Sequence, residues 1–386
     1  MRLLIIFPSA NRGGAENYAL TIAAAAIKDG WEVHAAFPKT AKTASLIQDF
    51  QDRGILYHAL DIAPVGGHHF KLFREHLPQL LRTLVLLTRL KPDAIHLTLP
   101  WAYYGFDSLL AAGLLKIPTL VAFQLYPRRF FYSNPKIKAF AWARSRHQKW
   151  VAISENNRTF ISESFEVAAS EISLIYNGTQ INSEQSNLTQ EQTHQLRQAI
   201  RQELGIPLES PILLTVGRLS RIKGYAELIE VVPSIIQEFP QVKFVWVGEG
   251  DLEQYLIQRA KTLGVQDNVL LLGYRLDVPK LLTSADIFVF PTHFEGLPFA
   301  IIEAIAHQLP VIASDASSIP EVIENKVQGI LFPSKDKESL RNAIIWALQH
   351  PQEMEKMAEN ARPKLEAFSE EKMIQQTLGL IREITA

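Results

Sequence analysis

The chain has 386 residues, a net charge of −1 and no cysteine, and 47% of its residues are hydrophobic. This length predicts two domains rather than one core, and the absence of cysteine excludes disulfide scaffolds and thiolate metal sites. The near-neutral charge, with no recognition module, argues against a nucleic-acid partner. We therefore expect a soluble, cytoplasmic, globular protein.

Short apolar runs alternate with helical patterns through the first half of the chain. Strands are predicted from LLIIFP, EVHAAFP, DAIHLTL, TLVAFQL and WVAIS, and helices from residues 15–29 and 70–89. The first run is too short for a secretory signal peptide. This alternation is typical of a parallel sheet covered by helices on both faces. It predicts a first α/β domain over residues 1–180.

A second strand series follows a polar segment. NGTQINSEQSNLTQEQTHQLRQ is predicted to be a linker that leads into a helix, and the strands PILLTVG, VKFVWVG, NVLLLG, DIFVFP, PVIAS and GILFP come after it. We predict a second doubly wound domain over residues 181–368 and a terminal helix over 369–386 that packs back across the domain junction. Such sheets bind ligands at the carboxyl ends of their strands, and two facing sheets form a cleft.

Positive charge is concentrated in residues 127–149, which hold seven Lys or Arg, five aromatic residues and no acid. Two interpretations stay open. The segment could contact an anionic membrane or a phosphorylated acceptor. It could equally be a solvated helix face with its aromatic side chains in the core.

Two glycines, Gly13 and Gly14, lie between the first strand and the first helix, where a phosphate or sugar could approach the main chain. The pattern is not G-x-G-x-x-G, and no acid ends the second strand. A nicotinamide dinucleotide is therefore disfavoured.

The second domain has a more specific loop, TVGRLSRIKGYAELI, between a strand and a helix. Its Arg218 and Lys223 could neutralise a diphosphate, because two cations near a helix start suit that ligand. The alternative is a surface loop whose charges are solvated.

The segment FEGLPFAIIEA follows the strand DIFVFP. Glu295 is expected in the loop, Gly296 lets a ligand approach, and Pro298 suits the first helical position. Glu303 is the only charge of an apolar helix, and a buried carboxylate needs hydrogen-bond donors. A ribose diol would supply two donors, and a buried Lys or Arg is the alternative partner.

Five features follow one another along the chain: GGAE, VGRLSRIKG, WVGEGDLE, LLGYRLDVPKLLTSADIFVFPTHFEGLP and the paired glutamates. In this order and spacing, the chain resembles the retaining glycosyltransferases of family four over nearly its whole length. The resemblance implies the GT-B fold of two facing Rossmann-like domains. It implies transfer of a hexose, with retention, from a UDP- or GDP-linked sugar to a glycan or lipid-linked acceptor in the synthesis of cell-envelope polysaccharide, lipopolysaccharide or glycolipid. No metal or cofactor is expected, and the enzyme would act in the cytoplasm or at the inner face of the plasma membrane.

The resemblance also assigns residues. Glu295 would hold the donor hexose, Glu303 the ribose, Arg218 and Lys223 the diphosphate, and main-chain groups of Tyr274 and Arg275 would lie near the base. The predicted catalytic residues are Glu295, Arg218 and Lys223, and the predicted donor-binding residues are Gly14, Gly217, Tyr274, Arg275, Gly296, Leu297, Pro298, Phe299 and Glu303.

Candidate acceptor or cleft contacts are His96, Gln124 and Tyr126. His96 and His293 are expected in loops that face the cleft. Gln124 stands where many relatives have a histidine. One alternative is therefore a sensor protein that binds the donor but has lost turnover through this change. A sugar-nucleotide epimerase and a phosphorylase of similar fold are others, although no motif for a lysine-bound pyridoxal phosphate is present.

Overall fold

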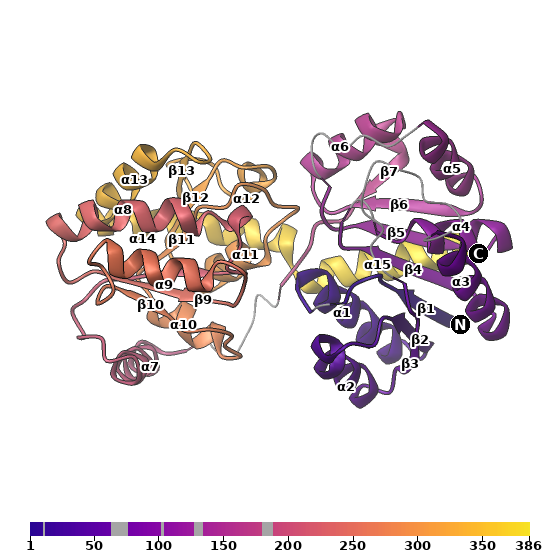
Figure 1. Ribbon diagram of the computed structural model, residues 1–386, viewed down its shortest axis with the longest axis horizontal. Helices are drawn as coiled ribbons and strands as arrows, with labels where there is room; N and C mark the ends of the chain where they lie inside the picture. Colours follow the sequence, from indigo (N-terminus) through magenta and orange to yellow (C-terminus); the bar gives the residue numbers. More distant parts are fainter. Residues whose placement is uncertain (11, 63–75, 102–103, 127–133, 180–187) are drawn as a thin grey trace. The chain divides into compact units, whose positions relative to one another are not determined.

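Figure 1 presents the computed structural model, which describes all residues except 11, 63–75, 102–103, 127–133 and 180–187. The chain divides into two compact units, one formed by Met1–Asn177 with Glu371–Ala386 and the other by Gly178–Glu370. Each unit is built on one sheet whose described strands are all parallel, with helices packed against it. The predicted fold class, two doubly wound α/β domains, is confirmed.

The sheet of the first unit has the order β3-β2-β1-β4-β5-β6-β7. Its strands are β1 (Arg2–Ile6), β2 (Glu32–Phe37), β3 (Leu56–Ala59), β4 (Ala94–Leu99), β5 (Thr119–Phe123), β6 (Gln148–Ala152) and β7 (Ile172–Leu174). Its helices before the linker are α1 (Gly14–Lys28), α2 (Ala44–Asp52), α3 (Leu77–Leu90), α4 (Phe106–Leu115), α5 (Asn134–Arg144) and α6 (Glu155–Phe165). The predicted helix over 70–89 begins at Leu77, and residues 70–75 lie outside the described part.

The sheet of the second unit has the order β10-β9-β8-β11-β12-β13. Its strands are β8 (Ile212–Val216), β9 (Lys243–Val247), β10 (Val269–Leu271), β11 (Ile287–Phe290), β12 (Val311–Ser314) and β13 (Ile330–Phe332). Its helices are α7 (Gln190–Glu203), α8 (Tyr225–Glu238), α9 (Glu253–Thr262), α10 (Val278–Ser284), α11 (Phe299–Ala306), α12 (Ile319–Val322), α13 (Lys337–Gln349) and α14 (Pro351–Ala361). All six predicted strands are present.

The terminal helix α15 (Glu370–Thr385) belongs to the first unit, although the chain before it belongs to the second. Arg382 forms an ion pair with Asp29 at the end of α1, and its guanidinium lies 5.4 Å from the centre of the Trp31 ring. The chain therefore leaves the first unit after Asn177 and returns to it at the start of α15.

The segment 127–149 is described only from residue 134 onward, so its Phe130, Phe131 and Tyr132 lie outside the described residues. Phe140 of α5 is fully buried and packs on Trp150 and Phe165. The core interpretation thus holds for Phe140, whereas contact with a membrane or a phosphorylated acceptor stays a prediction. None of the helices in the described ranges combines the length and the apolar character needed to cross a bilayer.

Candidate functional site

The two loops singled out in the second domain lie beside each other at the carboxyl edge of its sheet. β8 and β11 are neighbours, but the chain leads from β8 toward β10 on one side and from β11 toward β13 on the other. The loops that follow these two strands therefore diverge and leave a crevice, which is where open α/β sheets bind ligands. Residues 217–224 form one loop and residues 291–298 the other.

The loops are in main-chain contact, and a glycine permits it. Gly224 has a φ of +75°, and a Cβ atom there would lie 1.9 Å from the carbonyl oxygen of Pro291. The main-chain N–H of His293 donates to the carbonyl of Ile222 at 2.7 Å. Because main-chain atoms move less readily than side chains, these contacts fix the two loops relative to each other.

Lys223 and Glu295 form an ion pair between the two loops. Only 9% of Glu295 is exposed, and its Oε1 atom also lies 2.9 Å from the hydroxyl of Thr292. The Lys223 ammonium lies 5.3 Å from the centre of the Phe290 ring, at the end of β11. The structure thus brings together two of the three predicted catalytic residues. It gives Oε2 of Glu295 no hydrogen bond to any described residue.

Thr292 belongs to this cluster, and the sequence reasoning missed it. Its side chain is fully buried, and its hydroxyl lies 3.0 Å from the carbonyl of Ile222 and 2.9 Å from Glu295. Its own carbonyl accepts a hydrogen bond from Ser314 at the end of β12. The sequence offered one signal for this contact with Glu295: a hydroxyl residue stands three positions before the glutamate, at the end of a buried strand.

Arg218, the third predicted catalytic residue, directly follows Gly217 at the end of β8. Its side chain is exposed, and no ion pair or hydrogen bond joins its guanidinium to another described residue. The structure therefore leaves all its N–H donors available to a ligand, whereas the Lys223 ammonium already has one protein partner.

The helix α11 carries Glu303, as predicted, but it begins one residue later than expected. Pro298 is its N-cap, with an extended ψ of 118°, and Phe299 is the first helical residue. Gly296, Leu297 and Pro298 are buried in the turn that leads into it. Since an N-cap residue keeps non-helical dihedral angles, the correction moves the first free main-chain N–H groups to Phe299 and its successors.

Glu303 is mostly buried on an otherwise apolar helix. Burial raises the pKa of its carboxyl. Among the described residues, no side chain or main-chain group forms a hydrogen bond or ion pair with this carboxylate. The alternative partner weighed from the sequence, a buried Lys or Arg, is therefore not found in the described chain. A carboxylate in this condition favours binding of a ligand that brings donors.

The loop after β10 contains Tyr274 and Arg275. Tyr274 is 61% exposed. The guanidinium of Arg275 forms two hydrogen bonds to Asp277, both 2.7 Å, and one to Glu203 at 2.8 Å. These carboxylates raise the pKa of Arg275. Because its side chain is already occupied, Arg275 can serve a ligand through its main chain, which is the contact that was predicted.

His293 lies in the loop after β11, as expected. Its Nε2 atom is 3.1 Å from Oε2 of Glu227 in the first turn of α8. The ring is therefore directed toward α8, although the two atoms do not form a hydrogen bond.

In the first unit, Gly14 is the exposed first residue of α1, and Gly13 is the N-cap. The prediction for His96 is wrong: it lies inside β4 rather than in a loop, and none of its surface is exposed. Its two ring nitrogens lie 3.3 Å from the Tyr18 hydroxyl and 3.2 Å from the Thr98 hydroxyl. Burial lowers the pKa of His96 to about 4.

Gln124 and Tyr126, which follow β5, are also buried. The Gln124 side-chain oxygen accepts a hydrogen bond from Asn177 at 3.1 Å. The Tyr126 ring packs on Phe123 and Phe165 and is only 1% exposed. The aromatic ring of Tyr126 is therefore part of the core and is not exposed to a ligand.

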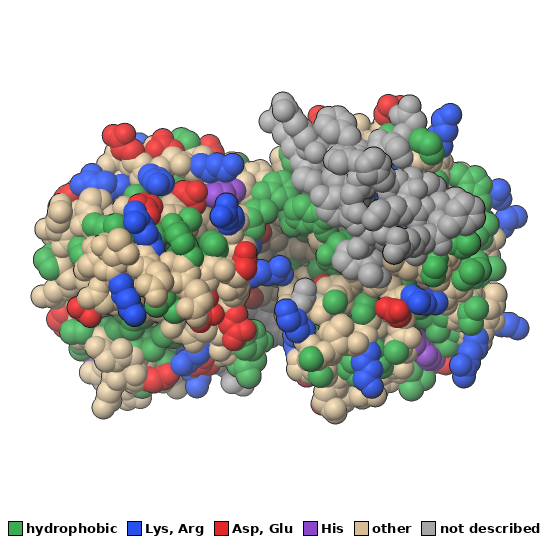
Figure 2. Space-filling model, viewed as in Figure 1, with side chains coloured by type: hydrophobic (Ala, Val, Ile, Leu, Met, Phe, Trp, Pro, Cys, Tyr) green, Lys and Arg blue, Asp and Glu red, His purple; other side chains and the backbone are tan. Residues whose placement is uncertain are grey.

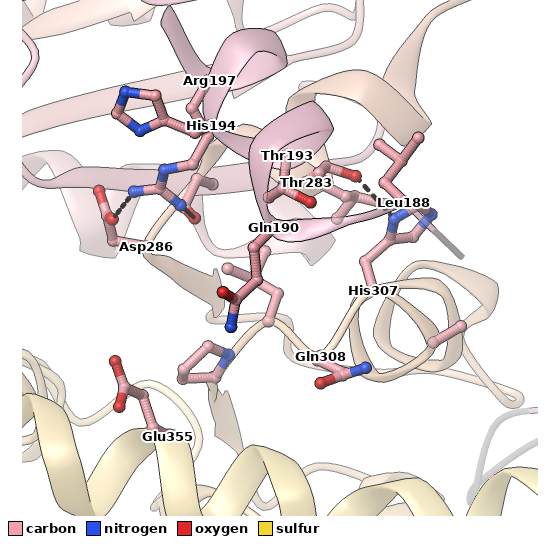
Figure 3. A pocket seen from close by; sticks show the side chains of 15 residues that line it. Leu188, Gln190, Thr193, His194, Arg197, Thr283, Asp286, His307, Gln308 and Glu355 are labelled. Atoms are coloured by element: carbon pink, nitrogen blue, oxygen red, sulfur yellow. Dashed lines mark hydrogen bonds and ion pairs between the residues drawn. The ribbon is translucent and has the colours of Figure 1, made fainter. Parts of the chain in front are cut away.

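A separate pocket lies at the other end of α11 and contains none of the predicted site residues (Figure 3). Part of its polar lining is paired. Arg197 of α7 binds Asp286, and Thr283 of α10 lies 3.0 Å from His307, as the dashed lines show. Since Asp286 and Pro310 directly precede β11 and β12, this pocket is at the amino edge of the sheet, away from the loops described above.

Two family models match the chain, glycosyl transferases group 1 over residues 197–364 and glycosyltransferase family 4 over residues 12–182. Among curated relatives, the putative teichuronic acid biosynthesis glycosyltransferase TuaC of Bacillus subtilis is 30% identical over 66% of this chain and 61% of TuaC. The UDP-Gal:alpha-D-GlcNAc-diphosphoundecaprenol alpha-1,3-galactosyltransferase of Escherichia coli is 33% identical over 42% of each chain. The matched part thus spans less than two thirds of these relatives.

Among solved structures, HepE of Anabaena in complex with UDP superimposes with a TM-score of 0.80 and 21% identity, over 99% of this chain and 100% of that one. The same protein was also solved with UDP and glucose and with UDP-glucose. At this identity the likeness establishes the fold, which is GT-B. With one family model covering most of each unit, the chain belongs to the group 1 glycosyltransferases.

Proposed function

We propose that the protein transfers a hexose from a UDP- or GDP-linked sugar to a hydroxyl of a glycan or lipid-linked acceptor in cell-envelope synthesis, with retention of configuration. One observation carries the proposal: the loop that bears Arg218 and Lys223 is joined to the loop of Glu295, and the helix that follows this second loop bears Glu303, a mostly buried carboxylate with no partner among the described residues. A ligand with both phosphates and hydroxyl groups matches these side chains together.

The cations suit the leaving group. Breaking the bond between the anomeric carbon and the phosphate oxygen places negative charge on the diphosphate. Arg218 can donate two parallel hydrogen bonds to it, and Lys223 adds a second positive charge. Groups that are already in place stabilise this developing charge without reorganisation at the moment of reaction.

Glu295 suits the sugar. Its Oε1 atom accepts from Lys223 and Thr292, while Oε2 remains open to a hexose hydroxyl. The ion pair also links sugar binding to phosphate binding. Lys223 faces the phosphate and at the same time holds the Glu295 carboxylate that contacts the sugar. Glu303 would accept hydrogen bonds from the ribose hydroxyls on the other side.

Retention follows if the acceptor hydroxyl attacks the face that the diphosphate leaves. The new bond joins the acceptor oxygen to the anomeric carbon, the old carbon–oxygen bond breaks, and a phosphate oxygen takes the hydroxyl proton. No protein nucleophile is then needed, and Glu295 positions the sugar rather than attacking it.

The relatives support the donor and acceptor classes. HepE binds UDP and UDP-glucose. The name of the galactosyltransferase from Escherichia coli specifies a UDP-linked donor and a diphosphoundecaprenol acceptor, and that of TuaC specifies teichuronic acid synthesis. These names guide the choice of compounds for the test.

The test is a panel of UDP- and GDP-sugars in thermal unfolding, followed by transfer assays with the stabilising donor. A ligand at a hundred times its dissociation constant stabilises the fold by about 2.7 kcal/mol. NMR of the product then reports the anomeric configuration. If a nucleotide-sugar stabilises the fold but no acceptor leads to release of the nucleotide, the protein binds the donor without turning it over, which is the alternative given above. A product of inverted configuration would contradict the mechanism.

A further inference from the structure

The pocket at the amino edge of the second sheet is large enough for a small-molecule ligand. Its volume is about 580 Å³, within the usual range for such sites. A second hollow of about 360 Å³ adjoins it, and the residues that line both are Arg197, Asp286, Pro310 and Glu355. The two hollows, together the amino-edge cleft, can therefore hold an elongated ligand.

Three side chains of the cleft have polar groups without a protein partner in the described chain. Gln190, Gln308 and Glu355 are exposed, and none forms a side-chain hydrogen bond or ion pair with another described residue. Gln190 begins α7, Glu355 lies on α14 and Gln308 follows α11; in Figure 3 their polar ends border one open space. An amide both donates and accepts hydrogen bonds, whereas a carboxylate only accepts them. The cleft thus offers a ligand donors and acceptors together.

Gln308 adopts a backbone conformation that favours glycine. Its φ is +56°, and it directly follows His307, the C-cap residue of α11. Its N–H donates to the carbonyl of Ile305, and the next N–H, of Leu309, donates to that of Ala304, both at 2.9 Å. A glycine would make this helix end with less strain. The end of the helix therefore does not explain the glutamine side chain, which borders the cleft instead.

The charges of the cleft nearly balance, which disfavours a phosphate-bearing ligand. Arg197 and Arg201 both form ion pairs with Asp286. The other acids of the lining are Glu209 and Glu355, so three carboxylates accompany two guanidinium groups. Figure 2 shows Lys or Arg side chains interspersed with Asp or Glu on the described surface of this unit that the view presents, so that surface has no broad positive patch to attract an anion.

Neutral polar and apolar groups also line the cleft. His307 lies 3.0 Å from the Thr283 hydroxyl, and burial lowers its pKa, so its ring is uncharged at neutral pH. The apolar walls are formed by Leu188, Leu282, Leu309 and Pro310. A sugar ring needs both kinds of surface, because its hydroxyls donate and accept hydrogen bonds while its C–H groups are apolar.

We propose that the amino-edge cleft binds a neutral oligosaccharide. The hydroxyl groups of the ligand form hydrogen bonds with Gln190, Gln308 and Glu355, and its C–H groups pack on the apolar walls. Two adjoining hollows favour several linked sugar units over a single one. The inference goes beyond the proposed function and does not depend on it, because none of the residues assigned to the nucleotide-sugar lines the cleft.

The test is isothermal titration calorimetry of the full chain, without nucleotide-sugar, with maltotriose, cellotriose, xylotriose and mannotriose. We expect at least one of these neutral trisaccharides to bind. Trigalacturonic acid should bind more weakly, because its carboxylates would meet the carboxylate of Glu355. Gln308→Gly and Glu355→Ala should each weaken binding of the neutral trisaccharide by about two- to tenfold, which is the effect of one lost hydrogen bond.

A matched control is available on the same helix. Glu353 is also exposed on α14 but does not line the cleft, so Glu353→Ala removes the same charge and should leave binding unchanged. Gln308→Gly should not lower the melting temperature, since glycine tolerates the left-handed conformation, and this separates a lost contact from a lost fold. The proposal would be overturned by binding of none of the neutral trisaccharides, by stronger binding of trigalacturonic acid, by unchanged affinity in both cleft variants, or by an equal loss in Glu353→Ala.

Discussion

Replacing Glu303 with glutamine should stabilise the fold and weaken donor binding at once. The carboxylate is mostly buried and has no partner among the described residues. The free-energy cost of its desolvation therefore destabilises the folded state. An uncompensated buried polar group costs about 1–3 kcal/mol in proteins, and a charged one more. The neutral amide should therefore raise the free energy of unfolding by on the order of 1 kcal/mol.

The same change should remove charge-assisted hydrogen bonds to the ribose. Bonds to charged groups contribute about 1.5–3 kcal/mol, which corresponds to roughly a 10- to 150-fold weaker affinity for the donor. We expect this as a higher KM for the nucleotide-sugar. A purely structural glutamate would give the opposite pattern, with stability and activity falling together.

The stability gain should depend on pH. Burial raises the pKa of Glu303, so the charge penalty is absent below the unfolded carboxyl value of about 4.3 and complete above the folded value. Urea denaturation of the wild type and Glu303→Gln should thus converge near pH 4 and differ most at pH 8. Glu359→Gln, at an exposed position on α14, controls for the loss of one charge. A destabilised Glu303→Gln variant with an unchanged KM would refute the reasoning.

Further predictions concern three positions and the metal requirement. Glu295→Gln should lower kcat/KM at least tenfold and leave the variant folded, because the amide still accepts from Lys223; activity equal to wild type would exclude a contact to the sugar. Gly224→Ala should lower the melting temperature, because a left-handed alanine costs about 1–2 kcal/mol and its Cβ would meet the Pro291 carbonyl; an unchanged melting temperature would contradict the close approach. Burial lowers the pKa of His96 to about 4, so stability should be complete above about pH 6.5 and fall by on the order of 3 kcal/mol down to pH 4. His96→Gln should flatten that dependence, as urea midpoints at pH 7 and 5 would show. Transfer should persist in EDTA, and its loss with recovery on adding Mg²⁺ would contradict a metal-independent mechanism.

The positions of the two candidate loops could be predicted from the sequence because apolar runs, glycines and prolines mark strand ends. The strand DIFVFP and the glycine–proline turn after it place Glu295 at the carboxyl edge of β11. The same reasoning failed for His96, although it lies in the predicted strand DAIHLTL. A parallel strand covered on both faces has no outward side, so a histidine within it is buried whichever way it points.

Side-chain partners were the part that the sequence could not provide. Lys223 and Glu295 are 72 positions apart, and their ion pair depends on β8 and β11 being neighbours. The order of strands in a sheet is a property of the whole fold. The same is true of Thr292, because its hydroxyl contacts the carbonyl of Ile222 only when the fold brings the two loops together.

The two glutamates of the site show how one side chain can serve two purposes in different surroundings. Glu295 has an ammonium and a hydroxyl on one oxygen, so it is held in place. Glu303 has neither among the residues that the structure describes, and burial raises the pKa of its carboxyl. A group that is already held can orient a sugar at little further entropic loss, whereas a group without partners gains most from a ligand that supplies donors. The unequal surroundings therefore favour orientation of the hexose by Glu295 and affinity for the nucleotide from Glu303, so that substitutions at the two positions should act mainly on kcat and on KM, respectively.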